Sequence, residues 1–287
     1  MVEVKVCVLG SGSRGNCILV RTSGTAVLID AGFSAAETKR RLEATETRPE
    51  DIAAVLVGHE HLDHVRGLDV IARKWKTPVF MNRGSAEPFA GTTARSWNLR
   101  VFQNGYPFEL GDFVVTPFSV VHDARDPVGF TLETRGIKVF VATDLGRATL
   151  LVRERLRGAR IAVLEANHDR ELLLNGSRPW KIKQRIKSGQ GHLSNEDAGR
   201  LLAEEGGSGL ADVLLAHLSQ DCNRPELALQ EIGGRLKAAM DEPPRLHLTF
   251  QGRISPVVAA RQSGNGKEKT AASTPDRQLR FIGGSWV

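Results

Sequence analysis

The stretch His59-Glu60-His61-Leu62-Asp63-His64 decides the fold of this 287-residue sequence. Residues 53–57 before it form an apolar run that predicts a buried strand, and residues 65–75 after it follow a helical pattern. A strand that ends in such a turn places the turn's side chains at the carboxyl edge of a sheet, where α/β proteins bind their ligands. Four residues of the stretch have side chains that bind metal ions: His59, His61, Asp63 and His64.

The spacing of these four side chains has a geometric consequence. His59 and His61 are two residues apart, so in extended backbone they project to the same side. Asp63 and His64 follow where the chain turns into the helix, so they are able to point at a second position nearby. We therefore expect this stretch to supply ligands to two metal ions, rather than to be a polar loop with solvated histidines.

Length and composition restrict the class of protein. The chain is long enough for one large α/β domain or two small ones, and its net charge of +6 permits a polyanionic partner without requiring one. No run approaches the roughly 18 apolar residues of a membrane span, and the N-terminus lacks the pattern of a signal peptide. Cys7, Cys17 and Cys222 match no disulfide framework or zinc motif. We expect a cytoplasmic protein with no membrane contact and no disulfide-linked partner.

Strands and helices alternate along the rest of the chain. Strands are predicted at 2–9, 17–22, 25–30, 53–57, 78–81, 99–102, 113–121, 128–134, 137–142, 161–165, 212–216 and 245–250. Helices are predicted at 34–44, 65–75, 147–157, 194–205 and 223–240. This order predicts two sheets packed on each other and flanked by helices. We expect one domain over residues 1–255, which the strand at 245–250 closes, and a polar, flexible tail over 256–287.

Three further candidate ligands lie where an apolar strand is predicted to stop. They are His122, Asp144 and His217. A lone histidine at the end of a strand is usually structural, but three side chains at one sheet edge complete two ligand sets. We predict one set of His59, His61 and His122, and a second set of Asp63, His64 and His217. An anionic carboxylate is the natural bridge between two cations, so Asp144 is expected to lie between the sets.

The order of these residues resembles that of the metallo-β-lactamase fold superfamily. The resemblance covers about residues 1–255 and implies an α/β (α+β) fold, a four-layer αβ/βα sandwich of two mixed sheets flanked by helices. It also implies that Asp30 supports the metal site without binding metal. Secreted lactamases that hydrolyse antibiotics have cysteine where Asp144 stands, and flavodiiron relatives have glutamate at the position of His61. Because this chain has Asp144 and His61 at these positions, the sequence argues against both branches.

Several separated motifs resemble the YycJ/WalJ family, whose members are regarded as bacterial cytoplasmic 5′→3′ DNA exonucleases. They lie at residues 10–16, 122–124, 127–129, 165–169, 191–195 and 216–219. The resemblance implies a phosphodiester hydrolase acting on DNA rather than RNA, with a hydroxide formed between two divalent metals. Zinc or manganese suits this ligand set, with iron as a further candidate. One departure is Gly58, where threonine commonly precedes the first histidine; no ligand is lost by it.

Glu165 and His192 match a glutamate–histidine pair in relatives such as ribonuclease Z. In this interpretation the carboxylate orients and charges an imidazole near the leaving oxygen. The competing interpretation is a structural hydrogen bond between the end of a strand and the start of a helix. With the two aspartates of the metal site, this predicts four catalytic residues: Asp63, Asp144, Glu165 and His192.

The candidates for substrate binding are mostly basic. Trp180, Lys181, Lys183 and Arg185 belong to a stretch with no acidic residue before Glu196, and they precede His192. Cations there would hold phosphates and Trp180 would stack on a base, although a solvated charged face explains the stretch equally well. Arg14 and His168 are further candidates for a phosphate contact. A plain hairpin entry and a structural histidine are their respective alternatives.

Two other functions stay open at this point. One is a small-molecule hydrolase acting on cyclic phosphodiesters, thioesters or lactones. The Glu165/His192 pair and the basic stretch favour a larger phosphodiester substrate over these small molecules. The other is a metal-stabilised binding module without enzymatic activity, against which the complete ligand set argues. The sequence does not determine the oligomeric state.

Overall fold

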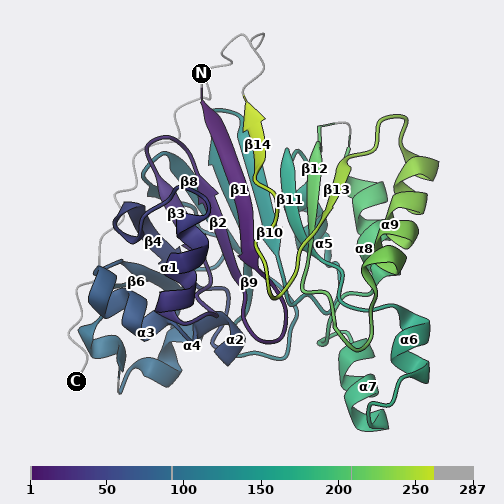
Figure 1. Ribbon diagram of the computed structural model, residues 1–287, viewed down its shortest axis with the longest axis horizontal. Coiled ribbons are helices and arrows are strands. Elements are labelled where there is room, and N and C mark those ends of the chain that lie inside the picture. Colours follow the sequence, from purple (N-terminus) through teal and green to yellow (C-terminus); the bar gives the residue numbers. More distant parts are fainter. Residues whose placement is uncertain (1, 92, 208, 262–287) are drawn as a thin grey trace.

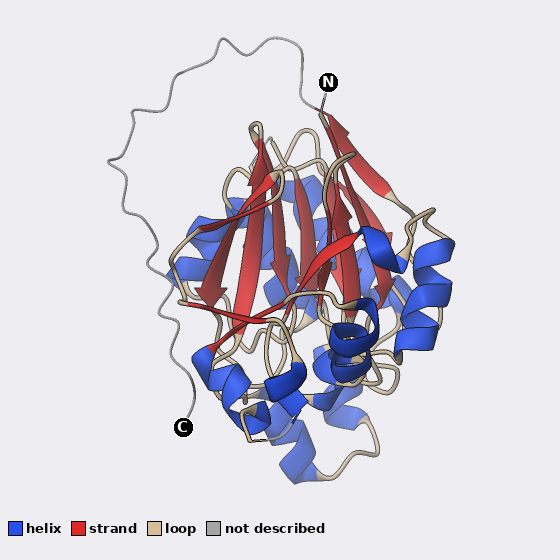
Figure 2. Ribbon diagram, turned by 90° about the vertical axis from the view of Figure 1, so that its left-hand side faces the viewer, coloured by secondary structure: helices blue, strands red, loops and turns tan. Residues whose placement is uncertain are grey.

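Two mixed β-sheets pack face to face in this computed structural model, which describes residues 2–91, 93–207 and 209–261 (Figures 1 and 2). Over these residues the first sheet has the order β14-β1-β2-β3-β4-β5-β6 and the second the order β13-β12-β11-β10-β9-β8-β7. The strands of the first sheet are β1 (Glu3–Gly10), β2 (Cys17–Arg21), β3 (Ala26–Ile29), β4 (Ile52–Leu56), β5 (Val79–Asn82), β6 (Leu99–Phe102) and β14 (Val258–Arg261). Those of the second are β7 (Phe108–Leu110), β8 (Phe113–Ser119), β9 (Val128–Thr134), β10 (Ile137–Ala142), β11 (Ile161–Glu165), β12 (Asp212–Ala216) and β13 (Arg245–Leu248).

Helices cover the outer face of each sheet (Figure 1). On the first sheet they are α1 (Ala35–Glu43), α2 (Leu62–Val65), α3 (Leu68–Val70) and α4 (Arg83–Ala86). The helices that follow β10 in the chain are α5 (Leu150–Leu156), α6 (Arg170–Asn175), α7 (Trp180–Lys187), α8 (Asn195–Glu205) and α9 (Pro225–Ala239). Short 3₁₀ turns span Pro49–Asp51, Glu87–Phe89 and Thr93–Ser96, and a π-helical turn spans Ile71–Trp75. The layers confirm the predicted αβ/βα sandwich.

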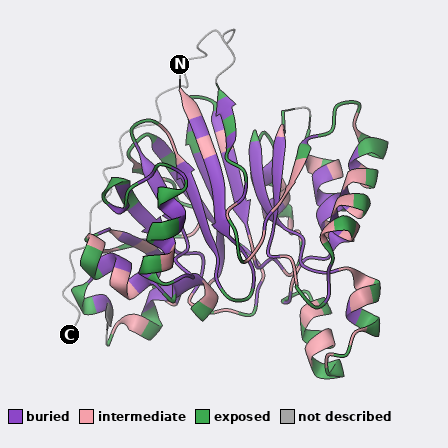
Figure 3. Ribbon diagram, viewed as in Figure 1, coloured by how far each residue is buried: buried purple, intermediate pink, exposed green. Residues whose placement is uncertain are grey.

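Alternating side chains along the strands build the layers. Val4, Val6 and Val8 of β1 belong to the core between the two sheets, whereas Cys7 and Leu9 pack with the helices on the other side. This follows from the two-residue period of a strand. A third core lies between the second sheet and helices α5, α8 and α9. Figure 3 shows the result: buried strands in the middle, flanked by helices such as α8 that have one buried face, whereas α7 has no buried residue.

Each sheet is parallel on one side, and this determines where the site forms. Strands β3 to β6 run parallel to one another, as do β10 to β13, while the remaining pairs are antiparallel. The carboxyl ends of parallel strands meet at one edge of their sheet. The loops that carry the candidate ligands therefore emerge at the same end of the sandwich.

The helix predicted at 65–75 was wrong in its start and its continuity. Helix α2 begins at Leu62, and Gly67 separates it from α3 and the π-helical turn. The backbone of Gly67 packs against the first sheet's loop, where its N–H donates to Ala31 O and a Cβ atom would lie 2.0 Å from Phe33 O. A regular helix with a side chain at this position does not fit.

The predicted domain boundary at residue 255 is too early, because β14 lies beyond it. The chain leaves β13 in the second sheet and returns to the first as β14, which pairs antiparallel with β1 up to Arg261. Val258 and Ala260 are buried and alternate with exposed residues, but the sequence there is a run of only four apolar residues, 257–260, which shows no alternation. The strand at 245–250 therefore does not close the fold. Residues 262–287 of the expected tail lie outside the described residues.

Val258 and Val257 offer a matched test of β14. Val258 is 4% exposed and lies opposite Val6, whereas Val257 is 48% exposed. Val258→Ala should lower the free energy of unfolding by about 1–2.5 kcal/mol through lost burial and a residual cavity. The same change at Val257 should cost less than about 0.5 kcal/mol. Urea unfolding of both variants measures this, and equal losses would show that β14 adds no buried surface.

Candidate metal centre

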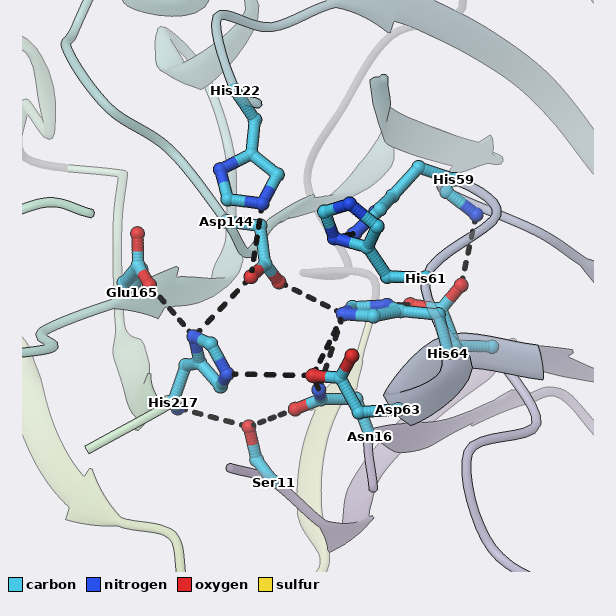
Figure 4. Close-up of polar contacts among 12 residues, drawn as sticks. Ser11, Asn16, His59, His61, Asp63, His64, His122, Asp144, Glu165 and His217 are labelled. Carbon is cyan, nitrogen blue, oxygen red and sulfur yellow. Dashed lines mark hydrogen bonds and ion pairs between the residues drawn. The ribbon is translucent and has the colours of Figure 1, made fainter. Parts of the chain in front are cut away.

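All seven predicted ligands converge at the carboxyl end of the sandwich (Figure 4). The loop after β4 and helix α2 supply four of them, and the loops after β8, β10 and β12 supply one each. They are His59, His61, Asp63, His64, His122, Asp144 and His217. Both sheets thus contribute to one site, which neither sheet could form alone.

His59, His61 and His122 form a three-histidine group whose ring nitrogens lie within 4.8 Å of one another. The closest pair is His59 Nε2 and His61 Nδ1, 3.0 Å apart. His122 Nδ1 lies 3.0 Å from Gly191 O, and because a carbonyl only accepts, Nδ1 carries the hydrogen and Nε2 keeps its lone pair. Burial, with His64 nearby, holds the pKa of His59 well below its usual range. His59 is therefore neutral, the form that binds metal.

The second group surrounds the Asp63 carboxylate. Asp63 Oδ2 lies 3.6 Å from His64 Nε2 and 3.9 Å from His217 Nε2. His217 Nε2 is buried and has no hydrogen-bond partner among the described residues. A buried polar atom without a partner is costly, so it calls for a ligand. The donor groups whose ligand atoms lie within 4.8 Å of one another on this side of the site are His59, His64 and Asp144, and Asp144, Glu165, His192 and His217. Asp63 lies just outside them, so the set of Asp63, His64 and His217 stays a prediction.

Asp144 lies between the two groups, as its predicted bridging position requires. Its Oδ2 is 3.0 Å from His64 Nε2, and its Oδ1 is 3.7 Å from His122 Nε2. Burial alone would raise the pKa of this carboxyl, but the surrounding imidazoles, above all His217 and His64, hold the pKa well below its usual range. Asp144 is thus an anion at the centre of a histidine cluster. Its Oδ2 is buried without a hydrogen bond, which again fits a bound cation.

Asp30, Asp144 and His217 have backbone angles that are unusual for residues other than glycine. Their φ values are +63°, +55° and +56°, in the left-handed region. Each such conformation costs about 1–3 kcal/mol and persists where the surrounding structure holds it, commonly at functional sites. All three residues directly follow or closely follow a strand, and the sharp turn directs each side chain into the cluster.

Asp30 supports the site as the family resemblance implied. Its Oδ2 lies 2.7 Å from His64 Nδ1, and its Oδ1 accepts the Gly58 N–H at 2.8 Å. The carboxylate thereby fixes the ring orientation of His64 and leaves its Nε2 directed at Asp63 and Asp144.

Ser11 and Asn16 also belong to the site, and the sequence reasoning missed them. Asn16 Nδ2 donates to Asp63 Oδ2 at 3.3 Å, and Ser11 Oγ accepts the His217 N–H at 2.8 Å. Ser11 Oγ in turn donates to Asn16 Oδ1. Their loop follows β1 at the same sheet edge, and that position was the available signal.

Glu165 joins two histidines and is completely buried. Its Oε1 lies 2.8 Å from both His192 Nδ1 and His217 Nδ1, while its Oε2 accepts the N–H groups of Leu145 and Leu193. Burial would raise the pKa of Glu165, but His192 and His217 lower it to about 2. The predicted contact between Glu165 and His192 is present. The contact with His217, which ties this pair to the metal site, was not foreseen.

The predicted substrate-binding residues differ in position. Helices α6 and α7 project at the same end of the molecule as α2, which carries Asp63 and His64 (Figure 1). Trp180 is 62% exposed there, and Lys181 is exposed beside it. Two neighbours are already engaged: Lys183 Nζ donates to Leu174 O, and Arg185 Nε to Asp123 Oδ2.

Arg14 and His168 complete the set of predicted substrate contacts. Arg14 is exposed, and its Nη2 donates to Gln220 Oε1 at 3.1 Å. His168 is only 2% exposed. Burial lowers the pKa of His168 to about 4, so it is a neutral interior imidazole. His168 Nδ1 has no hydrogen-bond partner among the described residues, so the predicted phosphate contact of His168 stays a prediction beside its structural alternative.

Metal loading should release protons. Although burial lowers the pKa of His217, Asp144 and Glu165 raise it to about 9, so His217 is protonated at pH 7.5 in the metal-free protein. A metal binds the neutral ring, so apparent metal affinity should rise with pH up to about 9, as the raised pKa requires, and loading should release about one proton or more. Calorimetry in buffers of different ionisation enthalpy measures the number. A pH-independent affinity between pH 6 and 9 would contradict the prediction.

Comparison with known proteins places this geometry in a class. Residues 25–217 match a family model described as the Beta-lactamase superfamily domain. The metallo-β-lactamase fold protein YhfI from Bacillus subtilis has the same fold, with a TM-score of 0.68 and 18% identity over 88% of this chain and 99% of that one. The protein is therefore a member of the metallo-β-lactamase superfamily.

Closer relatives define the family. Exodeoxyribonuclease YycJ of Bacillus anthracis is 37% identical over 228 residues, which are 78% of this chain and 86% of the relative. Exodeoxyribonuclease WalJ of Streptococcus pneumoniae strain D39 is 33% identical over 242 residues, covering 83% and 90% respectively. The chain belongs to the YycJ/WalJ family.

Proposed function

We propose that this protein is a metal-dependent exodeoxyribonuclease that removes nucleotides from the 5′ end of DNA. The observation that carries the proposal is the convergence of metal-binding side chains from both sheets beside the Glu165–His192 pair. The relatives named as exodeoxyribonucleases, at 33% and 37% identity over most of the chain, support the same reaction.

Two divalent ions, zinc or manganese with iron as a further candidate, would be held by the two ligand groups. The first would use His59, His61 and His122, the second Asp63, His64 and His217, with Asp144 between them. Bound there, the ions would neutralise charge on a phosphate and lower the pKa of a water molecule.

The protein's own residues would orient the reaction. The Asp63 and Asp144 carboxylates face the space between the two groups and would position the attacking water. His192 is 22% exposed and its Nδ1 is held by Glu165, so its Nε2 would deliver a proton to the leaving oxygen.

DNA would approach across helix α7. Trp180 and Lys181 are exposed at the site's end of the molecule and are the residues best placed to stack on a base and to hold a phosphate. Lys183 and Arg185 would help only after giving up their present partners. We place the protein in the cytoplasm, where the buried thiols of its three free cysteines would stay reduced. Among the described helices, none could span a membrane.

The direct test uses purified protein, Mn²⁺ or Zn²⁺, and DNA labelled at either its 5′ or its 3′ end. Stepwise loss from the 5′ end, abolished by EDTA and restored by metal, is the expected result. The same preparation is given a cyclic dinucleotide, a thioester and a lactone. Turnover of one of these with no cleavage of DNA would replace the proposal by a small-molecule hydrolase, and binding of metal without any turnover by a binding module.

Trp180→Ala and Lys181→Ala should each raise the KM for DNA. The loss of stacking at Trp180 predicts about a 10-fold increase, and the loss of a phosphate contact at Lys181 should weaken the salt dependence of binding. Lys39→Ala on α1 is the charge-matched control, since Lys39 is exposed and belongs to the far helix layer. KM values unchanged from wild type would mean that α7 is only a solvated face.

A further inference from the structure

A cavity of about 420 Å³ lies next to the candidate metal centre. Two loops form most of its wall: residues 12–14 after β1, and residues 218–221 after β12. Each loop also contacts the metal centre, because Asn16 donates to Asp63 and because His217 itself precedes Leu218. Neighbouring Cα atoms are about 3.8 Å apart, so on the second loop the wall begins at Leu218, one residue from the candidate ligand His217.

The charged groups of the cavity favour an anion. Arg14 and Arg178 contribute two guanidinium groups and Asp221 one carboxylate. Asp221 accepts from Arg178 Nη2, but its side chain is 66% exposed, so solvent screens the pair. Arg178 Nε is buried and has no hydrogen-bond partner in the part of the chain that the structure describes. A planar guanidinium with an unused donor suits a phosphate oxygen.

The Arg14 loop is held in place before any ligand binds. The Arg14 N–H donates to Gln251 Oε1 at 2.8 Å, and the Arg14 carbonyl accepts from Arg66 Nη1 at 2.7 Å. Gln251 also donates to Gly15 O. Because the loop is already ordered, a ligand would not have to supply the free energy of ordering it.

We propose that this cavity binds a single nucleoside monophosphate, namely the terminal nucleotide of the strand being degraded, through its phosphate. The volume lies in the range of about 300–1,000 Å³ that is typical of small-ligand pockets, so it suits one nucleotide rather than an oligonucleotide. A cavity of this size beside the metal centre leaves one nucleotide beyond the scissile bond. The products are therefore mononucleotides. The strand-end role rests on the proposed function, whereas binding of a free nucleotide does not.

The test compares wild type with the double variant Arg14→Ala/Arg178→Ala, all in the metal-loaded full chain. Arg48→Ala/Arg73→Ala is the charge-matched control, because Arg48 pairs with Asp51 and Arg73 with Asp69, and neither arginine lines the cavity. Deoxyadenosine 5′-monophosphate should bind the double variant about 10-fold or more weakly than wild type, as measured by calorimetry. The KM for 5′-phosphorylated DNA should rise by a similar factor, and the wild-type preference for a 5′-phosphate over a 5′-hydroxyl should disappear. Hydrolysis of bis(p-nitrophenyl) phosphate, which has no terminal nucleotide, should be affected much less than that of DNA.

The outcomes separate this proposal from the proposed function. Equal affinity of wild type and double variant for the nucleotide would overturn the pocket. A parallel loss on bis(p-nitrophenyl) phosphate would also overturn it, because the arginines would then act through the metal centre. Weaker nucleotide binding with an unchanged KM for DNA would overturn the strand-end role and assign the cavity to free nucleotide. If wild type cleaves neither DNA nor the small diester, the proposed function fails. The nucleotide-binding measurement would still show whether the cavity binds a nucleotide.

Discussion

Asp63→Ala should hydrolyse DNA at least about 1,000-fold more slowly than wild type, since it removes a group expected to supply several kcal/mol of transition-state stabilisation. The Asp63 carboxylate lies 3.6 Å from His64 Nε2 and 3.9 Å from His217 Nε2, so its loss removes a negative charge that faces both rings. The fold should survive, because the Asp63 side chain is 21% exposed and Asn16 Nδ2 keeps a second acceptor in Gly12 O. We expect an unfolding free energy within about 1 kcal/mol of wild type.

Glu60→Ala is the matched control for Asp63→Ala. Glu60 lies in the same turn, but its Oε1 accepts the N–H of Arg125, whereas Asp63 Oδ2 faces His64 and His217. Its activity should stay within a few-fold of wild type. Rates on end-labelled DNA, metal content and urea unfolding together decide the matter. A fully active Asp63→Ala protein would rule out the mechanism. Equal losses of activity in the two variants would mean that either substitution only disturbs the turn.

His192→Asn should lose about 100-fold or more in kcat on DNA, the usual contribution of a general acid. The distinguishing measurement is the same rate on bis(p-nitrophenyl) phosphate. Its leaving group is stable as an anion and needs no proton, so the variant should be nearly as active as wild type on this substrate. A structural role for His192 would predict equal losses on both substrates. That result would contradict proton delivery by His192.

Glu165→Gln should have a broader effect than His192→Asn. The charged Glu165 carboxylate contacts two imidazoles and two backbone N–H groups, and a glutamine amide would direct an NH₂ group at some of these donors. Leaving buried groups unpaired in such a network costs about 3–5 kcal/mol, so the melting temperature should fall together with the activity. The pKa of His217 should also fall from about 9, because Glu165 is one of the groups that raise it. Unchanged stability would show that the network relaxes around the amide.

Most of the fold and the positions of the ligands could be predicted from local signals. Strand 161–165 and strand 212–216 were predicted with the bounds that the structure shows, because each is a short apolar run before a polar turn. Ser34 and Ser194 cap α1 and α8 as their sequence pattern indicates, each accepting a backbone N–H three residues on. The ligands were found because strand ends that carry histidine or aspartate are rare and meet at one edge.

The missed features depend on contacts between distant segments. β14 pairs with a strand about 250 residues earlier, and its four residues carry too short a pattern to be recognised alone. Asn16 lies in a glycine- and serine-rich loop, a composition that predicts a flexible segment. Its hydrogen bond to Asp63, 47 residues away, could not be predicted from that composition. The second partner of Glu165 is His217, on the neighbouring strand's loop. Pairing of this kind follows from the tertiary fold and leaves no local trace.

Strand β1 separates the start of the described chain from the chemistry. It begins at Glu3 at one end of the sandwich and delivers the loop with Ser11 and Asn16 at the other, as Figure 1 shows. Its eight residues span roughly 25 Å at about 3.3 Å per residue. A tether attached ahead of β1 would therefore hold the protein to a glass surface or bead with the metal centre turned toward the solution. That geometry suits single-molecule recording of how far one enzyme travels along a stretched DNA before it dissociates.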